Sequence, residues 1–521
     1  MKMGRRAWGG LVALLVFIAL ALTEPALGLT DDAEAYLGAS TTYARWAVEG
    51  PYDHDGTLAA FAVNHEHPPL AKYAMGASWW LLHARTGALP SVLAARLGII
   101  ALAAWLAYLV FAFAWDFVGR TAAFTAPLLL FSMPRFFFHA HVETLDLVVA
   151  ATSFFALTAF ARVGTSRASA VYAGVAFGLA LASKLNAPFL LPACALVVLA
   201  RRIPGLLHAE EGRPRDLLAL ASMMTIGPLL FLALWPWMWF QTGAHLAEYA
   251  GFHLRHYGIL FFYFGKIYSE PFAPWHAPFV MTAITTPPVT LTLALAGGVL
   301  ALRSRRAAGW LIVLGAATHI GVAALPSVPR YGGVKLFLPL FPLLALLAGW
   351  TVQAVVDRAR LLRWKRVLAV AAAVLPAVAS LALVHPLHLS YYSMLVGGLP
   401  GAVRVGFERQ YYDLLYPQLL EWMNRSLPEN TAVTFLPNNV EYMRNPHWWR
   451  SDGRIRQDLR FVRFDEAQVV VLSHERRWPS YPELAARCEH LPQLWELRLE
   501  GVPLVTAYRL QTDDIDAQPA Q

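Results

Sequence analysis

Charge is scarce in this 521-residue chain. Asp, Glu, Lys and Arg make up 15% of it, whereas a soluble protein carries about 25%. Hydrophobic residues make up 57%, many of them in runs of about 20 that are long enough to cross a bilayer. This composition excludes an ordinary soluble domain and predicts a polytopic membrane protein. The net charge of +8 does not indicate a nucleic-acid partner, because the arginines lie mostly in short loops, where they orient a membrane protein.

Cysteine is also scarce, with two residues in the chain. Cys194 lies in an apolar run and Cys488 near the C-terminus, so we expect no internal disulfide and see no zinc-ligand spacing. Internal repeats and low-complexity linkers are missing. The N-terminal run "RRAWGGLVALLVFIALAL" could be a cleaved signal peptide, but its length and the multi-span region after it favour an uncleaved first helix.

The apolar runs predict a fold of about 11–13 transmembrane helices. Crossings are expected near residues 7–29, 91–117, 120–137, 143–163, 168–184, 186–202, 215–238, 276–302, 308–326, 332–353 and 366–385. Arg5 and Arg6 place the N-terminus in the cytoplasm, and the most basic connections then fall on the same side. This alternation requires residues 69–86 not to cross, so we expect a re-entrant or interfacial helix there.

With this topology, residues 30–68, the turn "HAHVETLD", residues 239–275 and the tail all face the outside of the membrane. The composition of the tail differs from that of the apolar runs: "TAVTFLPNN", "AQVVVLS" and "VPLVTAYRL" predict strands, and "YYDLLYPQLLEWMNRSL" predicts a helix. We therefore expect a transmembrane domain over 1–385, with its site in the loops 30–68 and 239–275. A small extracytoplasmic α/β domain is expected over 386–521.

Two acidic residues follow the first apolar run directly. Asp31 and Asp32 precede a pattern that predicts an amphipathic helix over 33–47. Either carboxylate could cap that helix, or serve as a general base at the membrane surface. The sequence alone leaves both interpretations open.

The stretch "NHEHPPLAKY" (64–73) places Glu66 and Lys72 around a helix start, because its prolines end one helix and can begin the next. A helix N-terminus suits an anion. A metal site is the alternative, since His65 and His67 would share one face of an extended strand near "DHDG". No strong zinc spacing supports it.

Further ionisable residues lie at predicted outer ends of crossings. "MPRFFFHAHVETLD" contains His141 and Asp146, among other charged groups that are costly near hydrocarbon unless they serve a site or pair with one another. Lys184 in "LASKLNAP" either snorkels to the surface or binds a ligand.

Two later stretches are candidates as well. The loop containing His256 is rich in aromatic residues, which fit either an interfacial belt or a sugar or lipid head group. In "SVPRYGGVKLFLPLF", Arg330, Tyr331 and Lys335 stand at the outer end of a crossing. The positive-inside rule does not explain cations on that side, so an anionic ligand is favoured.

Taken in order, these pieces resemble the GT-C superfamily of membrane glycosyltransferases, above all the protein O-mannosyltransferases and the aminoarabinose transferases that modify lipid A. Asp32 followed by Tyr36 is similar to the Asp-Glu-x-x-Tyr of the family, and "HPPLAK" resembles its His-Pro-Pro-Leu-Gly-Lys. "AARLG", "HAHVETLD", "SKLNAPFLLP" and "RYGGVKLFLPLF" follow in the order of the family. Ala33 departs from the pattern, which often has glutamate there, so Asp31 is an alternative to Asp32.

The resemblance implies an inverting transfer of a sugar from a polyprenyl phosphate to a hydroxyl of protein, lipid A or another glycan. Asp32, Asp31 and Glu66 would be catalytic. The residues expected to bind donor phosphate and sugar are His67, Lys72, Arg96, His141, Asp146, Lys184, His256, Arg330 and Tyr331. Such donors need no cofactor, and a divalent metal is only weakly supported. Membrane lipids are expected partners and nucleic acid is not. The resemblance also implies that the membrane is a bacterial cytoplasmic (inner) membrane and that the domain expected over 386–521 is periplasmic.

Two other classes remain open. Buried polar residues also mark the substrate path of a transporter or flippase, although those proteins tend to show repeated halves. A scaffold that binds a partner through its tail is the third class. The gathering of polar residues at one membrane face favours an enzyme.

Overall fold

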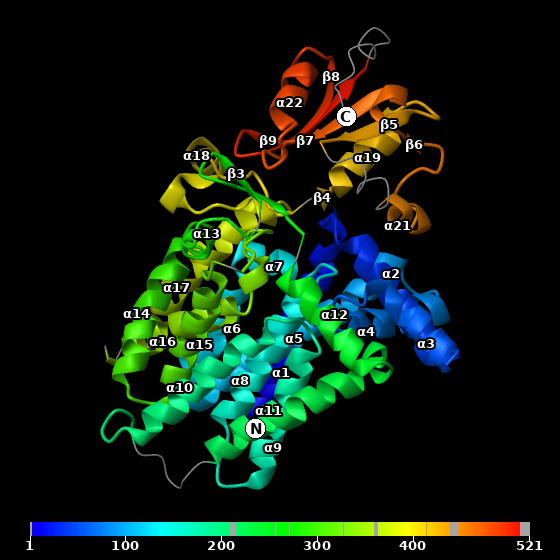
Figure 1. The fold of residues 1–521 in the computed structure, drawn as a ribbon. Coiled ribbons are helices and arrows are strands. Elements are labelled where there is room, and N and C mark those ends of the chain that lie inside the picture. The colour runs from blue at the N-terminus through cyan, green and yellow to red at the C-terminus, as the bar shows by residue number, and fades with distance from the viewer. Residues whose placement is uncertain are drawn as a thin grey trace.

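The structure is a computed structural model that describes residues 3–510, apart from 209–214, 256, 270, 327, 359–362, 413 and 438–445. It has two parts (Figure 1). A helical bundle, called here the membrane region, runs from α1 to α17 and has the N-terminus at its far end. The C-terminal domain, from α19 to β9, lies at the opposite end of the bundle.

The bundle is built from apolar helices. They are α1 (Arg5–Thr23), α5 (Ser91–Phe117), α6 (Arg120–Phe131), α7 (Pro134–His139), α8 (Leu145–Ala161), α9 (Arg167–Leu181), α10 (Leu190–Arg202), α11 (Asp216–Leu234), α13 (Ala277–Thr285), α14 (Pro288–Arg303), α15 (Ala307–Ala323), α16 (Leu340–Arg358) and α17 (Arg363–Val384). Among the described residues, five segments are long and apolar enough to cross a bilayer: Arg5–Ala26, Ser91–Phe117, Asp216–Leu234, Leu340–Arg358 and Trp364–Val384. The predicted polytopic helical fold is confirmed.

Prolines divide two of the predicted crossings. The crossing expected over 276–302 consists of α13 and α14, because Pro287 and Pro288 interrupt the helix between them. The crossing expected over 120–137 ends at Phe131, and Pro134 then begins the short α7. Each of these two expected crossings therefore consists of two helices.

Smaller elements lie between the apolar helices or after the last of them. The helices are α2 (Ala33–Glu49), α3 (His54–Phe61), α4 (Leu70–Trp79), α12 (Thr242–Leu254) and α18 (Gly398–Val405), with the hairpin β2 (Leu260–Tyr263) and β3 (Lys266–Ser269). The short helical turns are Glu24–Ala26, Ala62–Asn64, Trp80–Arg85, Ala187–Phe189, Pro236–Trp239, Lys335–Phe337, His388–Ser390, Met394–Val396 and Phe464–Glu466. α2 matches the helix predicted over 33–47. A β-carbon at Gly76 or Gly98 would collide with a backbone carbonyl of α2 or α4, so glycine permits the close packing of α4 between α2 and α5.

The C-terminal domain is a five-stranded mixed sheet in the order β6–β5–β7–β9–β8. Its elements are α19 (Pro417–Ser426), β5 (Ala432–Leu436), α21 (Pro446–Ser451), β6 (Arg460–Phe461), β7 (Val469–Ser473), α22 (Tyr481–Glu489), β8 (Gln493–Leu499) and β9 (Val502–Arg509). β5 runs parallel to β6 and β7, while β9 runs antiparallel to β7 and β8. The predicted strands β5, β7 and β9 and a helix at α19 are present, whereas β6 and β8 were not predicted. Cys194 and Cys488 are both buried and unbonded, as expected.

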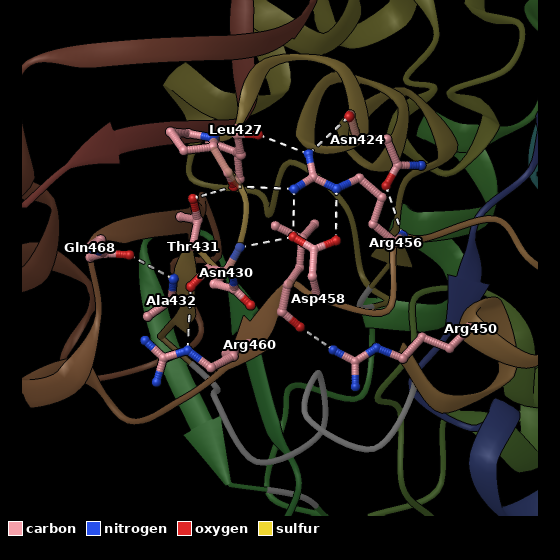
Figure 2. Close-up of polar contacts among 12 residues, drawn as sticks. Asn424, Leu427, Asn430, Thr431, Ala432, Arg450, Arg456, Asp458, Arg460 and Gln468 are labelled. Carbon is pink, nitrogen blue, oxygen red and sulfur yellow. Dashed lines mark hydrogen bonds and ion pairs between the residues drawn. The ribbon is translucent and has the colours of Figure 1, made fainter.

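A polar cluster around Arg456 fixes the end of α19 to the start of β5 (Figure 2). The guanidinium donates to the carbonyl oxygens of Asn424 and Leu427 at 3.2 and 2.8 Å, and pairs with Asp458 through two nitrogens. Asp458 also accepts the backbone N–H of Asn430 at 2.9 Å, and these bonds lower the pKa of its carboxyl group. The cluster therefore stabilises the domain from within.

Several contacts fix the C-terminal domain to the membrane region. The carboxylate of Asp452 accepts the backbone N–H groups of Ser91 and Val92 at 2.7 and 2.9 Å, and so caps the N-terminus of α5. Trp448 donates its indole N–H to Glu34 on α2 at 2.8 Å. β4 (Leu414–Leu415), which precedes the domain, pairs antiparallel with β1 (Leu29–Thr30), which follows α1.

Candidate active site

A cavity of about 720 Å³ lies between the two parts of the molecule, and we call it the Asp32 cavity. Its walls come from residues within segments 31–36, 64–67, 252–260, 331–335, 411–412 and 477–478, together with Lys184. Seven separate parts of the sequence thus converge on one space. The lining carries both carboxylates and cations, in contrast to the apolar bundle beneath it.

The carboxylate of Asp32 lines this cavity and is held by a lysine and a tyrosine. Its side chain is 28% exposed, and it accepts hydrogen bonds from Lys335 Nζ at 3.1 Å and from the hydroxyl of Tyr412. Burial raises the pKa of Asp32, but the charge of Lys335 and the hydrogen bond from Tyr412 outweigh it, so the net pKa lies below the ordinary value. Asp32 is therefore ionised at neutral pH, as a general base must be.

The pairing of β1 with β4 explains why Tyr412 reaches Asp32. Leu29 lies opposite Leu415 and Thr30 opposite Leu414, and this register continued by two residues sets Asp32 against Tyr412. The side chain of Asp32 makes no capping hydrogen bond to α2, although the residue occupies the N-cap position. The carboxylate therefore lines the cavity and does not cap the helix.

Lys335 is held by charge and by aromatic rings. Burial lowers the pKa of Lys335, but the carboxylates of Asp32 and Asp31 outweigh that effect and raise it, so the ammonium stays charged. Its Nζ lies 4.4 Å from the ring centre of Tyr412 and 5.3 Å from that of Tyr331. Asp31 lines the cavity beside Asp32 and accepts the backbone N–H of Asp32 at 3.0 Å.

A second ion pair joins the ends of two apolar helices. Lys184, just after α9, donates to Asp146 in the first turn of α8 at 2.6 Å, and the two side chains are 12% and 2% exposed. Lys184 lines the cavity. Asp146 is not part of the lining, but its ion pair holds the ammonium of Lys184 in place. Nearby His139 is buried, which lowers its pKa to about 4, so this imidazole is neutral at physiological pH.

The predicted Lys72 supports a loop rather than the cavity. Its buried ammonium donates to the carbonyl and side-chain oxygens of Asn64 and to the carbonyl of His67, each at 2.7 Å. Three acceptors match the three protons of an ammonium group. This bonding shapes the loop that brings Glu66 and His67 to the cavity wall.

Other predicted ligands also lie outside the cavity lining. Arg330 is 1% exposed, and its guanidinium donates to backbone carbonyls, including those of Ala323 and Ala273 at 3.1 and 2.8 Å. His141 is fully buried and lies 2.8 Å from the hydroxyl of Thr23. His256 lies outside the described residues.

Arg96, a further predicted phosphate ligand, is fully buried in α5. Its guanidinium binds Glu143 at 2.6 Å, Glu24 at 2.9 Å and the carbonyl of Gly28 at 2.6 Å. Glu143 in turn accepts the hydroxyl of Thr30 at 3.1 Å. This triad fixes the segment that leads directly into Asp31 and Asp32.

The structure thus brings six of the predicted residues to one cavity: Asp31, Asp32, Glu66, His67, Lys184 and Tyr331. Their chemical roles stay predictions. Lys335, for which the sequence already favoured an anionic ligand, lines the cavity as well. Sequence reasoning did not select Tyr412, Arg477 or Trp478 as site residues. These three had no local signal, because only the fold brings them there.

The residues of the alternative metal interpretation have the following contacts. His65 lies 3.0 Å from Glu248, and His54 lies 2.7 Å from Asp55. Within the described ranges, no group of three or more His, Cys, Asp or Glu side chains is arranged to hold a metal ion. A second cavity of about 350 Å³ lies at the other end of α5, where Asp116, Arg201 and Arg306 line it together with mostly apolar residues.

No protein-family model and no curated protein sequence matches the chain significantly. Solved structures do. The aminoarabinose transferase ArnT from Cupriavidus metallidurans in the apo state is 16% identical, with a TM-score of 0.50, and the match covers 97% of this chain and 99% of ArnT. The chain has the GT-C fold.

Two other matches have lower TM-scores. ArnT from the same organism bound to undecaprenyl phosphate is 17% identical with a TM-score of 0.48, and the match covers 96% of this chain and 97% of that one. The oligosaccharyltransferase AglB from Archaeoglobus fulgidus, in complex with an inhibitory peptide and a dolichol-phosphate, is 13% identical with a TM-score of 0.48. That match covers 95% of this chain and 74% of AglB. The fold conclusion rests on apo ArnT alone.

Proposed function

We propose that this protein is an inverting glycosyltransferase that moves a sugar from a polyprenyl-phosphate donor to an acceptor hydroxyl at the extracytoplasmic face of a bacterial inner membrane. The observation that carries the proposal is the Asp32 cavity, where an ionised carboxylate lies beside two lysines at the ends of apolar helices. The GT-C fold shared with ArnT supports it.

The proposed reaction is a single displacement. The acceptor oxygen forms a bond to the anomeric carbon as the bond from that carbon to the phosphate oxygen breaks. Asp32 takes the proton of the acceptor hydroxyl, and the lipid leaves as polyprenyl phosphate. One displacement from the opposite face inverts the anomeric centre, and no covalent enzyme intermediate is needed.

Fixed cations would stabilise the charge that grows on the leaving phosphate. Lys184 and Lys335 line the cavity, and each stands at the end of an apolar helix, where the head group of a membrane-embedded lipid would lie. A phosphate oxygen near Lys335 would compete with Asp32 for its ammonium. Donor binding would then weaken the ion pair that depresses the pKa of Asp32, and so make that carboxylate a better base. Glu66 would contact a sugar hydroxyl.

The experiment uses the full-length protein in nanodiscs with a panel of polyprenyl-phosphate sugars and a membrane extract as the source of acceptor. Release of free polyprenyl phosphate is measured for wild type, Asp32→Asn and the neighbouring Asp31→Asn. Loss of a general base costs about 10²–10⁴-fold, so we expect Asp32→Asn to lose at least about 100-fold in turnover and Asp31→Asn to lose much less.

Normal turnover in Asp32→Asn would show that Asp32 is not the base. The reverse ranking of the two variants would assign the base to Asp31. No release by the folded wild type from any donor, despite addition of the extract, would contradict the transferase proposal and favour a transporter of lipid-linked substrates.

A further inference from the structure

The C-terminal domain contributes directly to the Asp32 cavity. The loop that follows β7 places Arg477 and Trp478 in the cavity lining, far in sequence from the other wall residues. The guanidinium carbon of Arg477 lies 5.3 Å from the ring centre of Trp478. A cation and an aromatic ring therefore form one wall together, and both belong to the domain rather than to the membrane region.

Two buried carboxylates hold this loop in place. Glu475, whose side chain is 3% exposed, accepts from Arg477 Nη2 and from the indole N–H of Trp478, at 3.2 and 3.1 Å. Glu408 is fully buried and accepts the backbone N–H of Arg477 at 2.8 Å. Burying a carboxylate is unfavourable unless hydrogen bonds and cations compensate it, and the loop supplies such partners to both carboxylates. The side chains of Arg477 and Trp478 are thus set in fixed positions at the cavity.

The membrane region and the C-terminal domain contribute different side chains to the cavity wall. A polyprenyl tail must stay in the hydrocarbon, so its phosphate is confined to the side near Lys184 and Lys335, at the ends of apolar helices. Arg477 and Trp478 come from the domain side, which a water-facing molecule can approach. A guanidinium matches the geometry of a carboxylate or phosphate, and an indole offers a flat apolar face to a sugar ring.

We propose that Arg477 and Trp478 are the acceptor-binding wall of this cavity, and that they select an acceptor in which an anionic group lies beside a sugar ring. This inference rests on the proposed glycosyl transfer. It assigns the C-terminal domain a part in acceptor specificity, while the membrane region binds the donor. Arg477 and Trp478 bind the acceptor and take no part in moving the proton.

The neighbouring Arg476 provides a matched control. It has the same charge and lies in the same loop, but it donates to the carbonyl of Val403 at 2.8 Å and its guanidinium lies 5.3 Å from the ring centre of Phe262. It is not part of the cavity lining. Arg476→Gln therefore removes one positive charge from the loop without removing the proposed acceptor contact.

The experiment compares wild type, Arg477→Gln, Trp478→Leu and Arg476→Gln in nanodiscs with the donor that supports turnover. The membrane extract is separated by anion exchange, and polyprenyl phosphate release is measured against the amount of each fraction. Affinity for undecaprenyl phosphate is measured separately. Because Arg477→Gln removes the cation that Arg477 supplies to Glu475, the double variant Glu475→Gln/Arg477→Gln is included, and thermal unfolding of every variant is recorded.

We expect the acceptor activity in the fraction retained on the anion exchanger. The half-saturating amount of that fraction should rise roughly tenfold in Arg477→Gln and in the double variant, with undecaprenyl phosphate affinity within about twofold of wild type. Trp478→Leu should behave similarly, and Arg476→Gln should match wild type.

Three results would overturn the inference while leaving the proposed function intact: acceptor activity in the unretained fraction, equal behaviour of Arg477→Gln and Arg476→Gln, or an equal loss of undecaprenyl phosphate affinity in Arg477→Gln. A folded wild type that releases no polyprenyl phosphate from any donor would overturn the proposed function and this inference with it.

Discussion

Arg96 offers the sharpest test of the structure against the sequence, because the two assign it different tasks. The sequence resemblance predicts a phosphate ligand. In the structure its guanidinium is fully buried between Glu24 and Glu143, at 2.9 and 2.6 Å, and also binds the carbonyl of Gly28. We therefore expect Arg96→Met to act on stability rather than on donor binding.

The magnitude follows from this environment. Removing one partner of a buried ion pair costs about 3–5 kcal/mol, because the remaining charge stays buried and uncompensated. In Arg96→Met two carboxylates lose their cation, so the upper part of that range applies. Scaled by the unfolding entropy of a chain of this length, this corresponds to a fall in apparent Tm of about 4 °C. The segment from Glu24 to Thr30 would loosen as well, and with it the position of Asp32.

The assay is thermal unfolding in nanodiscs, combined with a titration of undecaprenyl phosphate. The triple variant Arg96→Met/Glu24→Gln/Glu143→Gln is the control, since it removes all three charges and should recover most of the lost stability. The reasoning would be refuted if Arg96→Met unfolded at the wild-type temperature and lost its affinity for lipid phosphate. That pair of results would show that Arg96 is a phosphate ligand, as the sequence resemblance predicts.

Two further predictions concern the cavity and the loop that borders it. Tyr412→Phe removes a hydrogen bond that lowers the pKa of Asp32, so that pKa should rise. Because the base must be ionised, the acid limb of kcat/KM for the donor should move to higher pH, and an unmoved limb would exclude Asp32 as the titrating base. Lys72→Met leaves the carbonyls of Asn64 and His67 without their donor, so apparent stability should fall by about 2 kcal/mol. Undecaprenyl phosphate affinity should stay within about twofold, whereas loss of that affinity at unchanged stability would make Lys72 a phosphate ligand.

Much of the membrane region was predictable from sequence, because a bilayer imposes simple requirements. A crossing helix must be apolar and long, and proline ends it, so composition and proline positions locate most of the bundle. The segments expected over 120–137 and 276–302 each contain two helices, because Pro134 and the pair Pro287–Pro288 interrupt them. The C-terminal strands β5, β7 and β9 were predictable because each is a short apolar segment that contains β-branched residues.

The candidate site was predictable only in part. Asp31, Asp32, Glu66 and Lys184 were identifiable because a charged residue at the end of an apolar run is costly without a purpose. The sequence could not decide which of two nearby cations faces the cavity. Arg330 and Lys335 lie five positions apart, yet the first is surrounded by backbone carbonyls and the second binds Asp32.

By itself, then, the sequence determined that the chain is a membrane protein with charged residues gathered at helix ends, since hydropathy and charge cost are local properties. The tertiary structure alone decided which of those residues meet. The β1–β4 register sets Tyr412 against Asp32, the loop after β7 brings Arg477 to the same cavity, and the buried triad turns Arg96 away from it. Contacts between segments hundreds of residues apart depend on packing and strand pairing, and no local pattern records them.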